Sequence, residues 1–232
     1  MQKQLILDIL APDTPSLDNF AGNANQQTLD ALRHDIGPGR AIYLYGGPGS
    51  GRTHLLHAMS RRPGHEYIDL ADNGAAALQA LVANETSGPT LIAIDNLHVL
   101  DDAGQAALFT LYNHWRQLGG TDHAFALVLA GSHAPRSMPL REDLRTRLGW
   151  DLVYRLHPLT DDERAMVLDS RARNLGLSLA SGIIPWLLVH YSRDMGHLNA
   201  LIDALNRYSL ERHRPVTLPL LKELLANTHP DH

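Results

Sequence analysis

A glycine-rich octapeptide contains the first residues whose types and spacing suggest chemistry. It combines four glycines with a cation and a hydroxyl, in the order Gly46, Gly47, Pro48, Gly49, Ser50, Gly51, Arg52 and Thr53. An apolar run over residues 40–45 precedes it and a helical pattern over residues 54–59 follows, as in a phosphate-binding P-loop. The glycines let successive backbone N–H groups point at phosphate oxygens, and the helix N-terminus adds partial positive charge. We therefore expect a nucleoside phosphate here, with Thr53 as a Mg²⁺ ligand; the alternative is a glycine-rich turn without a ligand.

Polar groups also follow two other candidate strands. The run over residues 90–96 is apolar until Asp95, which is typical of a buried parallel strand that delivers a carboxylate at its C-terminal end. In P-loop proteins such an aspartate holds Mg²⁺ directly or through water, and this is favoured over an aspartate in a plain turn. Ser132 follows the apolar run 125–130 and is a candidate sensor of a γ-phosphate, although an ordinary loop serine fits equally well.

Two positions predict slow intrinsic hydrolysis at this site. Arg52 stands where a P-loop usually has lysine, and its planar guanidinium is not equivalent to a compact ammonium. Asn96 stands where many ATPases of this type carry a second acid, and an amide cannot accept a proton as a general base. Since the binding residues remain, we expect nucleotide to be bound and hydrolysed weakly.

A short basic helix is predicted over residues 140–149. Its leucines fall on one stripe, Arg141 and Arg145 lie together on one flank, and Arg147 lies on the other flank in the last turn. Spacing alone favours a solvated basic face, which the helix dipole stabilises near the C-terminus.

These residues require a parallel sheet to position them. Five apolar runs alternate with helical patterns and predict an α/β domain with a five-stranded parallel sheet, at residues 40–45, 67–70, 90–96, 125–130 and 152–156. A capping box of Thr160 and Glu163 opens an all-helical region. Its helices are expected near residues 161–174, 181–192, 195–212 and 217–226. The predicted organisation is a tail over 1–16, a nucleotide-binding domain over 17–158 and a helical domain over 159–232.

Composition narrows the classes of function. The 232 residues include 44% hydrophobic residues and no cysteine, which excludes disulfides and fits a reducing cytoplasm. The formal net charge of −5 argues against autonomous binding to the DNA backbone, and no apolar run is long enough to span a membrane. Fourteen histidines include His54 and His57 at helical spacing, but no third ligand accompanies them, so we interpret both as packing and surface residues.

The N-terminal segment admits two interpretations. Residues 4–10 alternate apolar side chains, and prolines follow at positions 12 and 15. The pattern indicates an extended segment, which is either an edge strand or a short motif that docks in an apolar groove of another protein.

With these motifs in place, the chain resembles the bacterial initiator group of AAA+ ATPases and, within it, the Hda family of DnaA homologues. The resemblance rests on residues 17–20 with Gly22 and Asn25, on 51–58, 94–96, 109–113 and 143–150, and on the absence of a helix-turn-helix segment after the last helices. Residues 4–9 are similar to the sliding-clamp motif of that family.

The resemblance implies a P-loop AAA+ core followed by a lid, and a role as a negative regulator of replication initiation. It implies ADP or ATP as the nucleotide, held by the P-loop with Phe20, Asn25, Asn96 and Mg²⁺. It implies two partners, DnaA and the DNA polymerase III beta sliding clamp, and we also expect a homo-oligomer without sequence-specific DNA binding. The clamp would be contacted by Gln4, Leu5, Leu7 and Ile9. Arg147 matches the arginine finger of the family, which stimulates ATP hydrolysis by DnaA in trans, with Arg136, Arg141 and Arg145 as neighbours on the same face.

One position departs from the family pattern. Gly196 stands where the lid usually presents an arginine to the phosphates, and Arg193 three residues earlier is the candidate substitute. Two other functions compete with the regulator: a self-sufficient ATPase such as a helicase loader, which Arg52 and Asn96 disfavour, and a DNA-binding initiator, which the acidic balance disfavours.

Overall fold

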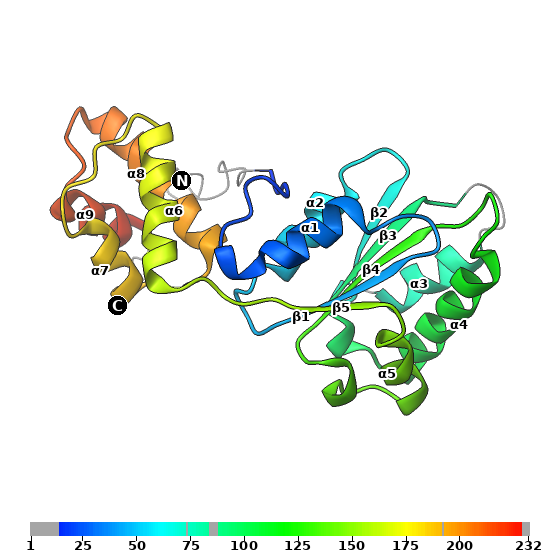
Figure 1. Cartoon of the computed structure of the whole chain (residues 1–232). Coiled ribbons are helices and arrows are strands. Elements are labelled where there is room, and N and C mark those ends of the chain that lie inside the picture. The colour runs from blue at the N-terminus through cyan, green and yellow to red at the C-terminus, as the bar shows by residue number, and fades with distance from the viewer. Residues whose placement is uncertain (1–13, 73, 84–87, 192, 229–232) are drawn as a thin grey trace. The chain divides into compact units, whose positions relative to one another are not determined.

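The computed structural model of the chain describes residues 14–72, 74–83, 88–191 and 193–228. These residues divide into two compact units, one over residues 15–158 and one that contains residues 159–228. The first is an α/β domain and the second is helical (Figure 1). No helix among the described residues is long and apolar enough to cross a membrane.

The first unit is built on a parallel sheet of five strands, as the sequence predicts. Its order is β2-β3-β4-β1-β5. The strands are β1 (Ala41–Tyr45), β2 (His65–Asp69), β3 (Leu91–Asp95), β4 (Ala126–Gly131) and β5 (Leu152–Arg155). All neighbouring pairs are parallel, so every strand ends at the same edge. Because β4 lies between β3 and β1, this edge brings together the P-loop, Asp95 and Ser132.

Helices cover both faces of this sheet. They are α1 (Gln26–His34), α2 (Arg52–Ser60), α3 (Gly74–Ala83), α4 (Asp102–Leu118) and α5 (Glu142–Leu148). Figure 1 shows α1 and α2 on one face and α3, α4 and α5 on the other. Alternate residues of each central strand serve the two cores: Ile42 packs with the α1–α2 side, whereas Tyr43 packs with the α3–α5 side.

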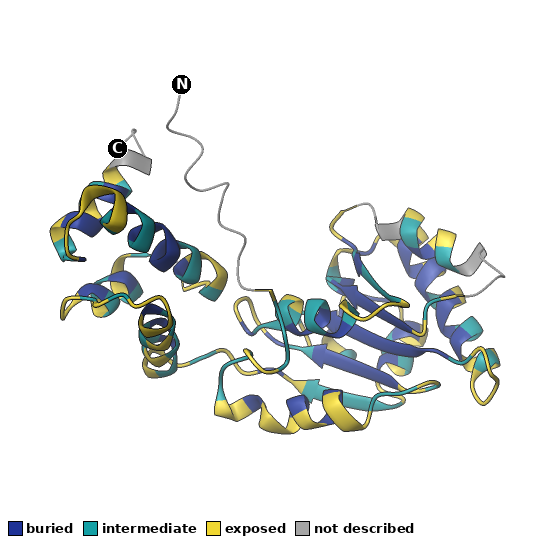
Figure 2. Ribbon diagram, turned by 90° about the horizontal axis from the view of Figure 1, so that it is seen from above, coloured by how far each residue is buried: buried dark blue, intermediate teal, exposed yellow. Residues whose placement is uncertain are grey.

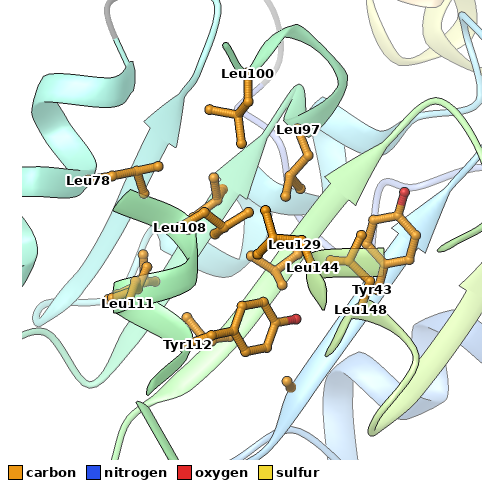
Figure 3. Close-up of a cluster of buried hydrophobic side chains, with 14 of the residues drawn as sticks. Tyr43, Leu78, Leu97, Leu100, Leu108, Leu111, Tyr112, Leu129, Leu144 and Leu148 are labelled. Atoms are coloured by element: carbon orange, nitrogen blue, oxygen red, sulfur yellow. The ribbon is translucent and has the colours of Figure 1, made fainter. Parts of the chain in front are cut away.

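The core under α5 fixes the basic helix on the domain. Leu140, Leu144 and Leu148 are all buried, as the predicted stripe requires, and they join Tyr43 and Leu129 in one cluster (Figure 3). Fully burying a leucine side chain contributes about 1.5–3 kcal/mol. The apolar stripe therefore determines which arginines of α5 are left at the surface.

The second unit contains α6 (Asp161–Asn174), α7 (Ile183–His190), α8 (Met195–Arg212) and α9 (Leu218–Thr228) around its own core. Figure 2 shows buried and exposed residues interspersed along the helices of this unit. The capping box at the start of α6 is present as predicted: Thr160 Oγ accepts from the Glu163 N–H, and the Glu163 carboxylate accepts from the Thr160 N–H at 2.9 Å. Buried Asp203 is paired with Arg171, whose Nε donates at 2.8 Å.

Some boundaries differ from the sequence prediction. β2 begins at His65 and ends at Asp69, instead of spanning 67–70, because its pairing with β3 runs from His65 opposite Leu91. α7 begins at Ile183 and not at 181, since Gly182 adopts a left-handed conformation with φ 97° just before it. The helix ends at His190, after which Tyr191 is extended.

Candidate nucleotide site and arginine cluster

The loop between β1 and α2 is packed so closely that two of its glycines have no room for a side chain. Gly51 has φ +89°, and a Cβ on it would lie 2.4 Å from Cε2 of Phe20. A Cβ on Gly46 would lie 2.6 Å from the Ser50 Oγ and 2.7 Å from the Leu156 carbonyl oxygen. The backbone therefore passes too close to its neighbours for any side chain at these two positions, and Phe20 closes one side of the loop.

Thr53 and Asp95 meet at the start of α2. The Thr53 Oγ1 donates to the Asp95 Oδ2 at 2.6 Å, and the Asn96 N–H donates to the Asp95 Oδ1 at 2.7 Å. Asp95 is fully buried. A hydroxyl and a carboxylate oxygen at this distance fit the two protein ligands of a P-loop Mg²⁺, which takes its remaining ligands from water and phosphate. The described residues hold no cluster of three or more His, Cys, Asp or Glu side chains that suits a metal without such help.

The side chain of Asn96 links the ends of β2 and β3. Its backbone is left-handed with φ 60°, and its Nδ2 donates to the Asp69 Oδ1 at 2.8 Å. This amide therefore ties the two strand ends together. A carboxylate at the same position would lie against Asp69, which explains in physical terms why an amide is suitable here.

Three buried polar atoms around the loop have no hydrogen-bond partner in the described part of the chain. They are the Ser50 Oγ, the Arg52 Nη1 and the His98 Nδ1. A buried polar atom without a partner costs about 1–3 kcal/mol, so such atoms are normally satisfied by a ligand or by water. Phosphate oxygens are acceptors, and a guanidinium N–H is a donor that they would satisfy. The residues present thus fit a nucleoside phosphate. Sequence reasoning missed His98, because nothing in its spacing marks it.

Ser132 lies at the same edge, directly after β4. Its Oγ is 2.7 Å from the His133 Nδ1, and the His133 carbonyl accepts from the Tyr43 hydroxyl at 2.6 Å. Burial raises the pKa of Tyr43, so this hydroxyl keeps its proton and holds the loop. The loop after β4 is thereby fixed beside the P-loop, since Gly131 is in register with Tyr45.

Asn25 and Arg193 are engaged elsewhere. Buried Asn25 makes two hydrogen bonds to the backbone of His157: its Nδ2 donates to the carbonyl at 2.9 Å, and its Oδ1 accepts from the N–H at 2.8 Å. These bonds fix the segment before α1 against the chain after β5. Arg193 belongs to the second unit and pairs with Asp161 at 3.2 Å. Gln4, Leu5, Leu7 and Ile9 lie outside the described residues.

Arg147 is held on the surface of the first unit by aromatic rings. Its guanidinium carbon lies 4.0 Å from the centroid of the Phe109 ring and 4.8 Å from that of Trp150, and its Nη1 donates to the Asn113 Oδ1 at 2.9 Å. Burial, together with the charge of Arg116, lowers the pKa of Arg147 from its usual range, but an arginine keeps its charge in a protein. No carboxylate of the described residues lies within ion-pair distance of it.

The other arginines of this helix are engaged differently. Arg141 pairs with Asp143 at 3.0 Å, and the Arg145 Nη1 donates to the Arg136 carbonyl at 3.3 Å. Arg116, which the sequence did not single out, lies over Trp150 at 4.7 Å. The direct contacts of half-buried Arg147 are thus two aromatic rings and one amide, and Asp143 acts on its charge only at longer range.

Comparisons with known proteins agree with this architecture. Residues 161–225 match the family model described as "Hda, lid domain". Over 238 residues the chain is 31% identical to an uncharacterised protein of Haemophilus influenzae, with 97% of this chain and 99% of the relative covered.

Two solved structures have the same fold. One is domain III of the replication initiation protein DnaA from Thermotoga maritima, with a TM-score of 0.71, 20% identity, and 93% of this chain and 97% of that chain covered. The other is AMPPCP-bound DnaA from Aquifex aeolicus, with a TM-score of 0.63, 19% identity, and 87% and 70% covered.

Proposed function

The chain belongs to the Hda family of DnaA-homologous AAA+ proteins, and from this premise we propose that it is a nucleotide-bound negative regulator of replication initiation. In this proposal it binds ADP or ATP through its P-loop with Mg²⁺ at Thr53 and Asp95. It lends Arg147 to the ATP site of an adjacent DnaA molecule. The AMPPCP-bound DnaA of the same fold supports the choice of an adenine nucleotide.

The observation that carries the proposal is the state of Arg147. It is a half-buried guanidinium held by two rings and one amide, with no carboxylate in the described residues within ion-pair distance. Such a group is oriented but not neutralised, which suits a cation that must stabilise negative charge on another molecule. An arginine of this kind, supplied in trans, is worth roughly 10³–10⁵ in the rate of phosphoryl transfer.

The protein's own nucleotide site supports the same division of roles. Asn96 replaces the acid that would activate water and is bonded to Asp69, so weak intrinsic hydrolysis is expected. Bound nucleotide would then act as a structural ligand, which satisfies the unpartnered Arg52 Nη1. The opposite role, a self-sufficient ATPase, would be supported by robust turnover of the protein alone.

The N-terminal tail completes the proposal as the link to the sliding clamp. Gln4, Leu5, Leu7 and Ile9 would insert in an apolar groove of the DNA-loaded clamp and so bring Arg147 close to DnaA. Replacing Gln4 and Leu5 with alanine should abolish clamp binding while the melting temperature stays unchanged. Unchanged clamp binding would refute this part.

The central experiment measures ATP hydrolysis by DnaA in the presence of clamp loaded on DNA. The wild-type chain should stimulate turnover, and Arg147→Ala should remove that stimulation while binding to the clamp persists. Arg62→Ala is the control, because it removes the same charge from an exposed position of the same unit that the proposal gives no role. Arg147→Lys keeps the charge without the planar fork and should restore little. Equal stimulation by the wild type and Arg147→Ala would exclude the trans role.

A further inference from the structure

His98 lies beside the phosphate loop and takes part in none of the interactions described so far. It belongs to η2 (Leu97–Val99), the short turn that follows left-handed Asn96. Leu97 is fully buried and anchors this turn, which packs against β4. The turn therefore lies at the carboxyl ends of β3 and β4, at the same edge of the sheet where β1 is followed by the P-loop.

Charged groups surround this imidazole on several elements. Arg52 of α2, Asp95 and Asp69 at the ends of β3 and β2, and His133 in the loop after β4 all interact with it electrostatically. Burial and the neighbouring Arg52 charge lower the pKa of His98, so the ring is neutral and carries a single N–H at neutral pH.

The Nδ1 of this ring is buried and has no hydrogen-bond partner in the described residues. The Arg52 Nη1 and the Ser50 Oγ share that condition at the same end of the sheet. A phosphoryl group has only acceptor atoms near neutral pH, whereas a guanidinium has only donors. A single phosphoryl group can therefore satisfy Arg52 and an Nδ1–H of His98 together, which a further cation or an apolar group cannot do.

We propose that His98 is a phosphate-binding residue of this site, whose Nδ1–H donates to the terminal phosphoryl group of the bound adenine nucleotide next to Arg52. This inference rests on the proposed function, in that it requires nucleotide in the P-loop. In this inference the turn after β3 contacts the terminal phosphate, at a position where the sequence shows no motif.

The experiment is calorimetric titration of the full-length chain with ADP and with AMP. His98→Phe keeps an aromatic ring but removes both nitrogens, so ADP should bind about 10-fold more weakly, in line with the loss of one charge-assisted bond. The effect on AMP should be less than about 2-fold, because its single phosphate does not reach the terminal position. His98→Asn keeps a donor near the Nδ1 position and should stay within about 3-fold of wild type for ADP.

The control is His123→Phe, an exposed residue at the opposite edge of the sheet, which should leave ADP affinity unchanged. Thermal unfolding verifies that each variant is folded, and His98→Ala replaces the Phe variant if the larger ring is not accommodated. Equal ADP affinity of the wild type and both apolar variants would overturn the inference about His98 alone. Failure of the wild type to bind any adenine nucleotide would instead overturn the nucleotide part of the proposed function.

Discussion

A substitution of Gly51 tests the closeness of the P-loop and Phe20. In Gly51→Ala the new methyl group would lie 2.4 Å from Cε2 and 2.8 Å from Cζ of the Phe20 ring. Contacts this short cannot persist, so either the ring or the loop must move. The position also has φ +89°, which alanine adopts only with strain.

The expected loss of unfolding free energy has two parts that can be measured separately. The left-handed backbone costs alanine about 1–2 kcal/mol, and the overpacking against Phe20 costs roughly 1–3 kcal/mol more. Gly51→Ala should therefore reduce the free energy of unfolding by about 2–4 kcal/mol, after allowing for a small gain from the less flexible unfolded chain. In a Phe20→Ala background only the backbone part remains, so the two substitutions should be coupled by about 1–3 kcal/mol.

The assay is urea unfolding of the wild type, both single variants and the double variant at pH 7.5, with ADP affinity measured in parallel. Gly51→Ala should also weaken ADP binding, because the loop amides lose their common direction. Additive free energies across the cycle would refute the steric reasoning, since they would mean that the methyl group and the ring do not meet.

Three further predictions concern charge and protonation. Replacing Asp151 by Asn should reduce the free energy of unfolding by about 1 kcal/mol at low salt, because the bidentate pair with half-exposed Arg40 is lost. That pair lowers the pKa of Asp151. The difference in unfolding free energy between wild type and variant should therefore vanish as pH falls below the ordinary carboxyl range. Burial lowers the pKa of His54, so below about pH 6.5 the unfolded chain binds more protons than the folded one, and stability should fall as pH falls. His54→Gln should make the free energy of unfolding less dependent on pH, as measured by urea unfolding at pH 5.5 and 7.5. Asn96→Asp sets a second carboxylate against Asp69, so a shared proton should raise the pKa of the pair, and stability in urea unfolding should fall as pH rises.

Local signals in the sequence are sufficient to predict the order of the helices and strands and the edge of the sheet that carries the P-loop. α6 begins at Asp161, as the Thr160 capping box predicts, and the strand ends carry the P-loop and Asp95 at one edge because parallel strands all end there. The sequence predicts a start for α7 two residues before the observed one, since apolar periodicity does not indicate the left-handed conformation of Gly182.

The parts of the site that sequence reasoning missed depend on contacts between distant segments. The bond from Asn96 to Asp69 joins residues 27 positions apart, and the bond from Arg147 to Asn113 joins residues 34 apart. Nothing in the spacing of α5 distinguishes the flank of Arg147 from a solvated basic face. The rings that hold this arginine come from α4 and from the chain after α5, so only the folded domain brings them together.

The free energy that holds Arg147 in place can be compared with the rate enhancement expected of its proposed trans role. Two ring contacts at partly exposed positions stabilise the guanidinium by about 0.5–1 kcal/mol each, and the amide bond to Asn113 adds about 1 kcal/mol. Releasing Arg147 therefore costs roughly 2–3 kcal/mol, whereas a finger that reaches a neighbouring triphosphate lowers the barrier by about 4–7 kcal/mol, the equivalent of 10³–10⁵ in rate. In the proposed trans role, the stabilisation of the transition state would therefore exceed the cost of releasing Arg147. A buried ion pair in the same place would have cost about as much to break as the finger supplies, and the absence of a carboxylate within ion-pair distance, among the residues that the structure describes, avoids that penalty.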